Sequence, residues 1–213
     1  ASDVYKRQGD ADAPLTLSGN LTASYSGVIN ANADITVTGY SYVYGNAVLN
    51  LNAGTLSAES IYLENPGSII QNGGHFSTNS LSLTGGATLA YGPGDSVARS
   101  IYVDNGGSLT LDKNLVLADV LLYGNTSFAP AGHNYTAPYL YLGDQAAVTY
   151  GPGDSVTNSV NVRTGSTLTL ARDLQLTESL NLESGGSVAR TTQTISARSF
   201  NVYDSTLAIN AAD

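Results

Sequence analysis

The sequence predicts an all-β protein that folds as a parallel β-helix, a solenoid of about ten coils with three short strands in each. Three observations favour this fold class: apolar residues recur every 19 or 20 positions, they alternate with polar residues in short runs, and turn-forming residues separate the runs. No segment has the 3.6-residue period of a helix over ten or more residues. The strict hexapeptide spacing typical of left-handed solenoids is also missing, so we expect right-handed coiling.

Three columns of inward-pointing apolar residues define the predicted coils. The first column is Ile29, Leu49, Ile69, Leu89, Leu109, Phe128, Val148, Leu168, Val188 and Leu207. The second column is Ile61, Leu81, Ile101, Val120, Leu140, Val160, Leu180 and Phe200. The third column is Leu17, Val37, Leu56, Phe76, Val97, Leu117, Ala137, Val156, Leu176 and Ile195. At about 4.8 Å per coil, the stacked coils predict a rod about 50 Å long.

One unit, residues 100–119, illustrates the predicted coil. Residues 100–103 alternate as a strand, and the Asp-Asn-Gly-Gly run at 104–107 predicts a turn. Residues 108–111 form the second strand and residues 115–117 the third. No linker interrupts this pattern, so we predict one domain over residues 9–213.

A longer repeat is superimposed on the coils. Residues 91–97, YGPGDSV, recur as residues 150–156, and the same interval separates Leu109 from Leu168. Because this interval corresponds to three coils, the sequence indicates duplication of a three-coil block.

Composition excludes several classes of protein. The net charge is −9, from 17 acidic and 8 basic residues, and no basic cluster is present, so we predict neither nucleic-acid binding nor binding to an anionic membrane surface. No run approaches the roughly 18 apolar residues of a membrane-spanning helix. Cysteine is absent, which removes disulfides and thiolate metal sites.

Candidate catalytic residues are few, and we predict a protein that is not an enzyme and needs no metal or cofactor. His75 and His133 are about three coils apart, without partners suggested by the sequence. Asp95 and Asp154 lie in equivalent turns three coils apart, roughly 14 Å, which is too far for paired carboxylates. The inward columns themselves offer no reactive group.

The outward residues of the second-column strand form a candidate binding stripe. They run Tyr62, Ser82, Tyr102, Leu121 and Tyr141, followed by Asn161, Asn181 and Asn201. Exposed tyrosine rings in alternate coils are suited to stacking on sugars or packing against a protein partner. Tyrosine is also a good strand former, so a purely structural stripe is the alternative. The asparagines are suited to a side-chain amide ladder.

A second outward array contains small hydroxyl side chains beside the first column. Its candidate residues are Ser108, Thr110, Thr149, Thr167 and Thr169. A flat serine and threonine face resembles the water-organising face of ice-binding solenoids, although Asn50 and Ile70 interrupt it in the earlier coils. A simple solvated strand face is the other interpretation.

The first eight residues, ASDVYKRQ, do not follow the repeat. Residues 3–8 resemble a translated transposon end used in sequencing libraries, which implies a metagenomic gene fragment and a non-native or disordered leader over residues 1–8. We therefore expect the natural protein to be longer than this chain.

The Gly-, Asn-, Ser- and Thr-rich coils of residues 9–213 resemble the passenger regions of bacterial autotransporters and filamentous-haemagglutinin-like adhesins. The resemblance implies a non-enzymatic, extracellular or cell-surface rod whose partners are glycans or cell-surface proteins. End-to-end or face-to-face association of rods is compatible with it. A carbohydrate-binding or polysaccharide-degrading β-helix and an ice-binding solenoid remain alternatives.

Overall fold

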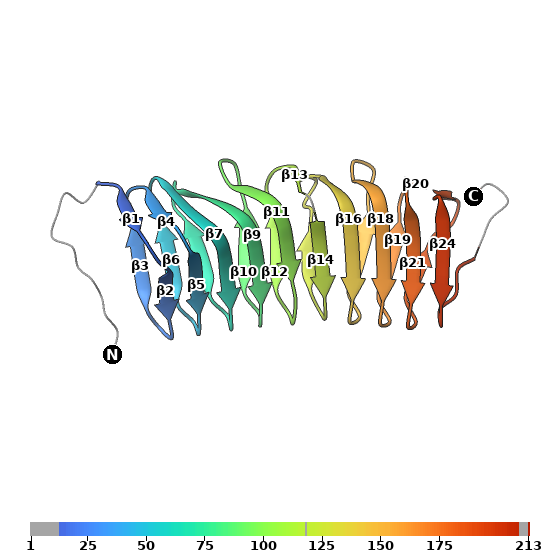
Figure 1. The fold of residues 1–213 in the computed structure, drawn as a ribbon, viewed down its shortest axis with the longest axis horizontal. Coiled ribbons are helices and arrows are strands. Elements are labelled where there is room, and N and C mark those ends of the chain that lie inside the picture. Colours follow the sequence, from blue (N-terminus) through green and yellow to red (C-terminus); the bar gives the residue numbers. More distant parts are fainter. Residues whose placement is uncertain (1–12, 118, 209–212) are drawn as a thin grey trace.

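A computed structural model describes residues 13–117, 119–208 and 213 as a rod made of stacked β-coils (Figure 1). Within these residues every regular element is a strand, every strand pair is parallel, and the chain makes about nine turns of a β-solenoid. The first described coils lie at one end of the rod and β24 at the other (Figure 1). The predicted fold class is confirmed, and the predicted ten coils are close to the observed number. The predicted leader, residues 1–8, lies outside the described residues.

The largest sheet of the described chain runs the whole length of the rod and has 13 strands. Ten of them follow one another in the order β1 (Leu15–Leu17), β4 (Ile35–Val37), β7 (Thr55–Glu64), β9 (His75–Thr84), β11 (Ser96–Val103), β14 (Asp119–Tyr123), β16 (Tyr135–Gly143), β18 (Ser155–Arg163), β21 (Ser179–Glu183) and β24 (Ser199–Tyr203). The other three are β2 (Leu21–Ser24), β5 (Tyr40–Tyr44) and β13 (Leu115–Val116).

The remaining described strands form three smaller sheets. The six-stranded sheet contains β3 (Val28–Ala31), β6 (Val48–Leu51), β8 (Ser68–Gln71), β10 (Thr88–Tyr91), β12 (Ser108–Leu111) and β15 (Ser127–Ala129). A three-stranded sheet contains β17 (Ala147–Tyr150), β19 (Thr167–Leu170) and β22 (Ser187–Ala189). The last pair is β20 (Leu174–Gln175) and β23 (Ile195–Ser196).

Strand register confirms the second predicted column from end to end. Each member of this column from Ile61 to Leu180 pairs with its equivalent in the next coil, and the last pair joins Leu180 to Phe200. All members are buried except Phe200, which is half-buried. The first column also pairs as predicted wherever its strands are hydrogen-bonded, for example Ile29 with Leu49 and Leu168 with Val188. Inward residues stack on their equivalents because a shift of one position would expose every apolar side chain of the strand.

The third predicted column is partly wrong, because each coil offers two inward positions on this face. Leu56 pairs with Ile35 rather than Val37, and Val97 pairs with Thr78 rather than Phe76. Ile195 pairs with Leu174 rather than Leu176. Residues two apart point to the same side of a strand, so spacing alone did not distinguish the two positions.

In the middle of the rod, two of the three predicted strands are one continuous strand. β7, β9, β11, β16 and β18 each span 8–10 residues and bend across two faces of the solenoid. A register shift between Val97 and Ser100 marks the bend in β11, and a similar shift follows Ala137 in β16. Bulges of this kind let a strand turn a corner without losing its pairing.

The prediction that the interior has no reactive groups is wrong at the two GPGD turns. Asp95 and Asp154 are 1% and 3% exposed, and they occupy the inward positions next to Phe76 and Tyr135 of the preceding coil. Each carboxylate bonds to two backbone N–H groups, one in its own turn and one in that preceding coil. The donors are Gly92 (2.7 Å) and Phe76 (3.0 Å) for Asp95, and Gly151 (2.6 Å) and Tyr135 (3.1 Å) for Asp154. These bonds join consecutive coils at the corner and offset part of the cost of burying the carboxylates.

A cation covers each of these corners from the following coil. Lys113 donates to the backbone oxygen of Asp95 and lies 4.7 Å from the centre of the Tyr91 ring. Arg172, the equivalent residue of the later block, donates to the backbone oxygen of Asp154 (3.1 Å) and lies 5.8 Å from the centre of the Tyr150 ring. The duplicated block therefore preserves a complete corner and not only the turn sequence.

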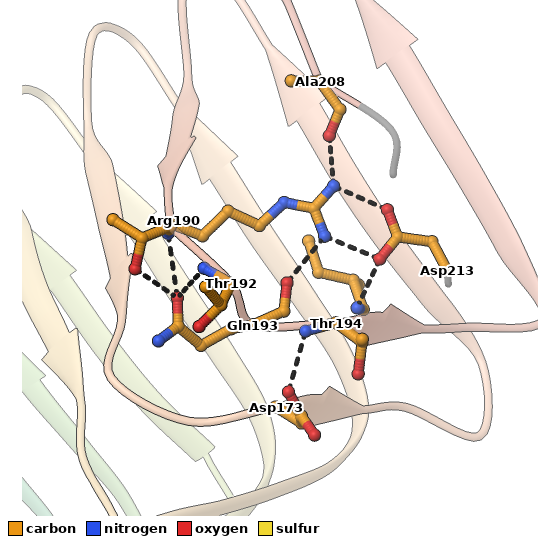
Figure 2. Close-up of polar contacts among 9 residues, drawn as sticks. Asp173, Arg190, Thr192, Gln193, Thr194, Ala208 and Asp213 are labelled. Atoms are coloured by element: carbon orange, nitrogen blue, oxygen red, sulfur yellow. Dashed lines mark hydrogen bonds and ion pairs between the residues drawn. The ribbon is translucent and has the colours of Figure 1, made fainter. Parts of the chain in front are cut away.

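Asp213 repeats part of this arrangement, and it follows Asp154 at the same interval as Asp154 follows Asp95. Its Oδ1 accepts a hydrogen bond from the backbone N–H of Ile195 in the preceding coil (2.8 Å), as Asp95 and Asp154 do with their preceding coils. Arg190 lies beside it (Figure 2). The Arg190 guanidinium forms an ion pair with Asp213 (2.6 Å) and donates to the backbone oxygen of Gln193 (3.1 Å). The residues before it, Thr206-Leu207-Ala208, repeat Thr88-Leu89-Ala90.

The predicted asparagine ladder is present along the outward column. The Asn181 amide donates to Asn161 (2.8 Å), and Asn201 donates to Asn181 (2.7 Å). A second ladder joins Asn32, Asn52 and Asn72 at a corner near the start of the rod. Repeated amide bonds of this kind add cohesion between coils beyond the backbone pairing.

Candidate functional site

The tyrosine stripe is the outward column of the largest sheet, Tyr42, Tyr62, Ser82, Tyr102, Leu121 and Tyr141. Register places all six side by side from coil to coil, so the structure aligns the predicted residues Tyr62, Tyr102 and Tyr141. Their rings are half-buried against neighbouring side chains. Two coils, about 10 Å, separate each predicted tyrosine from the next.

A compact aromatic cluster begins the stripe and was not found from the sequence. The rings of Tyr42 and Tyr62 stack with 5.0 Å between centres and 13° between planes. Tyr40 packs edge-on against both, with its centre 5.9 Å from that of Tyr62 and 6.1 Å from that of Tyr42. The YSYVY alternation of residues 40–44 was the available signal. It was missed because Ser41, where other coils have an aliphatic residue, breaks the second apolar column.

The later tyrosines of the stripe have different surroundings. The Tyr102 hydroxyl donates to Asp104 (2.9 Å), and its ring is tilted against Tyr123 with 5.4 Å between centres. Desolvation, followed by the bond to Asp104, raises the pKa of Tyr102 to about 12. The Tyr102 hydroxyl is therefore fixed as a neutral donor to a carboxylate, and it offers no nucleophile or base.

An open groove of about 270 Å³ lies along β4, β7, β9 and β11, next to the bend that leads to the tyrosine stripe. We name it the hydroxyl groove for the side chains of Thr36, Thr38, Ser57, Ser77 and Ser96, which line it. Glu59 and Asn79 also line it, and the Asn79 amide donates to Glu59 Oε2 (2.9 Å). Tyr40 is two residues after Thr38, so the groove and the aromatic cluster are neighbours along the chain, on the two faces that meet at this bend.

The predicted serine and threonine face is divided between two sheets. Ser108 and Thr110 lie on β12, whereas Thr149 is on β17 and both Thr167 and Thr169 are on β19. Thr149 pairs with Thr169 in register, and both are exposed. The Thr167 hydroxyl bonds to that of Ser187 (3.0 Å). The structure therefore brings together only the last three of the five predicted residues.

The groups with the most potential for chemistry have structural contacts. Asp95 and Asp154 bind backbone N–H groups, as described above, and the His75 side chain lies against Gly94. In the part of the chain that the structure describes, no three His, Asp or Glu side chains gather into a group that could hold a metal ion. Among the same residues there is no helix long and apolar enough to cross a membrane.

No protein-family model, curated protein or solved structure matches this chain.

Proposed function

We propose that this chain is a non-enzymatic interaction module, an extracellular or cell-surface rod of the adhesin type. The observation that most supports the proposal is the tyrosine stripe with its adjoining hydroxyl groove, an aromatic and polar surface presented along a rigid stack of coils. Aromatic side chains with a polar end are well suited to recognising partners from a wet surface. The resemblance of the repeats to secreted adhesins supports a location outside the cell.

The engagement of the buried carboxylates favours binding over catalysis. A general acid or base needs access to substrate, whereas Asp95 and Asp154 are buried and use their oxygens to join coils. Glu59 is the one carboxylate among the groove-lining residues, so the groove does not provide the pair of carboxylates that glycoside hydrolysis generally uses.

Two measurements test the proposal. Incubation with neutral and acidic plant and bacterial polysaccharides should release no product detectable by mass spectrometry, and clear turnover would overturn it. Beads coated with the rod should adhere to bacterial or eukaryotic cells more than beads coated with unfolded rod. Equal adhesion of the two preparations would also contradict it.

A further inference from the structure

We infer that the surface between the hydroxyl groove and Tyr62 binds a neutral glycan, with one sugar ring seated over Ser82. We call this position the Ser82 notch: the space above Ser82 between the rings of Tyr62 and Tyr102. The inference rests on the proposed interaction function and names its ligand class.

The two faces of the Tyr62 ring have different neighbours. It stacks on Tyr42 in the preceding coil with nearly parallel planes, which covers the first face. Because the Tyr62 ring is nearly parallel to the Tyr42 ring, its other face is directed along the rod, toward the next coil. Ser82 occupies the paired position in that coil and has a small side chain. The second face of Tyr62 therefore borders the smallest side chain of the tyrosine stripe.

The notch is wide enough for a sugar ring. Tyr62 and Tyr102 are two coils apart, about 10 Å. The hydrogen bond to Asp104 fixes the Tyr102 hydroxyl within its own coil, and the contact with Tyr123 places the ring against the following coil, on the side away from Ser82. A space of two coil heights between two aromatic residues accommodates a saturated ring, whose C–H groups pack well on an aromatic face.

Polar groups of the hydroxyl groove lie within reach of the notch. Asn79 and Ser80 precede Ser82 on β9, so the groove begins about 10 Å or less from the notch. The Glu59 carboxylate accepts one bond from Asn79 and can accept more. Hydroxyls, an amide and a carboxylate suit the vicinal hydroxyl groups of a second sugar.

Charge selects among glycans. Glu59 is the single charged side chain among those that line the groove, and the chain has a net charge of −9. Uronate- or sulfate-rich glycans would be repelled by this surface, whereas neutral ones would not. A protein partner is less suited to the groove, because protein interfaces have an apolar centre and this lining is mostly polar.

The test is affinity electrophoresis in gels containing galactomannan, xyloglucan or glucomannan, with polygalacturonate as the anionic probe. At least one neutral polysaccharide should retard the native rod, and polygalacturonate should not. Ser82→Tyr should weaken the retardation about tenfold or more, because the added ring fills the notch. Tyrosines in adjacent coils already stack at 5.0 Å in this column, so the variant should fold.

Matched variants isolate the notch. Leu121→Tyr adds the same ring to the same column two coils later and should bind as the native rod does. Tyr62→Phe keeps the stacking face and should bind, whereas Tyr62→Ala should not. Circular dichroism and thermal unfolding check that each variant is folded.

Three results would overturn the inference: no retardation by any neutral polysaccharide, native-like binding by folded Ser82→Tyr, or stronger retardation by polygalacturonate. The proposed function fails separately. If rod-coated beads still adhere to cells when the Ser82 notch is filled, the interaction module stands and its ligand lies elsewhere, for example a cell-surface protein.

Discussion

The two GPGD corners, at Asp95 and Asp154, have the same backbone bonds but different surroundings. Gln71 donates to Asp95 from the preceding coil (2.5 Å), whereas Pro130 occupies the corresponding position before Asp154 and has no side-chain donor. Duplication has thus kept the bonds that join the coils and allowed the residues around them to change. The buried aspartate, rather than its neighbours, is therefore the essential part of the corner.

The aromatic residue beneath each aspartate also differs between the corners. Phe76 occupies this position in the first block, and Tyr135 is its equivalent in the second. Both are fully buried, and the Tyr135 hydroxyl has no hydrogen-bond partner among the described residues. Burial raises the pKa of Tyr135 well above its ordinary value, so the hydroxyl stays neutral.

Removal of the buried carboxylates should have the largest effect. Asp154→Ala leaves the N–H groups of Gly151 and Tyr135 without their acceptor, and we expect a loss of about 3 kcal/mol in the free energy of unfolding. Asp95→Ala should cost about 1 kcal/mol more, because the Gln71 amide also loses its acceptor.

Urea denaturation followed by circular dichroism measures both effects. Exposed Asp112 provides the control, since Asp112→Ala should change stability by no more than about 0.5 kcal/mol. Equal, small losses for all three variants would mean that the corners do not join the coils.

Substitution of the third residue of each GPGD turn should have the next-largest effect, and the loss of stability should differ between the two corners. Gly94 has φ +93°, and an added Cβ would lie 2.5 Å from the His75 ring. Gly153 is outside the left-handed region, and its Cβ would meet the Asn134 amide, which is smaller and can rotate. We expect Gly94→Ala to cost about 2 kcal/mol and Gly153→Ala about 1 kcal/mol, measured as above. The reverse order would show that contact with the preceding coil outweighs backbone strain.

Exchange of the buried aromatic residues should have a smaller effect, with opposite signs at the two corners. Tyr135→Phe removes a buried hydroxyl that lacks a partner among the described residues, so we expect a gain of about 1 kcal/mol in the free energy of unfolding. Phe76→Tyr should lower the free energy of unfolding by a similar amount. A loss of stability in Tyr135→Phe would instead indicate an internal water molecule bound to the hydroxyl.

The pH dependence of Asp154 should be the smallest effect. Desolvation raises its pKa above the ordinary 3.8, against the lowering influence of the Gly151 and Tyr135 N–H groups and of Arg172. A raised carboxyl pKa means that the folded state binds the proton more tightly than the unfolded state. Its contribution to stability is therefore fully present below pH 3.8 and is lost as the pH rises through the raised pKa.

The measurement compares the native rod with Asp154→Asn between about pH 3 and pH 7. The stability of the native rod relative to the variant should fall as the pH rises. A relative stability that rises over the same interval would mean that the backbone N–H groups outweigh desolvation.

The predictable parts of the fold were those with one candidate position per coil. The second apolar column was correct from Ile61 to Phe200, because a single aliphatic residue marks each strand. The third column failed where two inward residues compete, as at Ile35 and Val37, and where Asp95 replaces an apolar residue. Hydrophobicity was a poor guide there because the buried group is a carboxylate.

The candidate site was predictable to a similar degree. The alignment of Tyr62, Tyr102 and Tyr141 followed from the period, since equivalent residues of successive coils must pair. The stacking of Tyr42 on Tyr62 did not follow, because side-chain orientation depends on contacts across the coil boundary. The hydroxyl groove was also missed, because it arises from the bends in β7, β9 and β11.

Sequence alone was enough for the period of the solenoid, the alternation of its faces and the order of residues in the outward columns. These features depend on local alternation and on a spacing that recurs along the chain. Which polar groups are buried and which aromatic faces are free became clear only from the stacked coils. Asp95 and Asp154 can be buried because the preceding coil supplies backbone N–H groups, and that supply exists only once the coils are stacked.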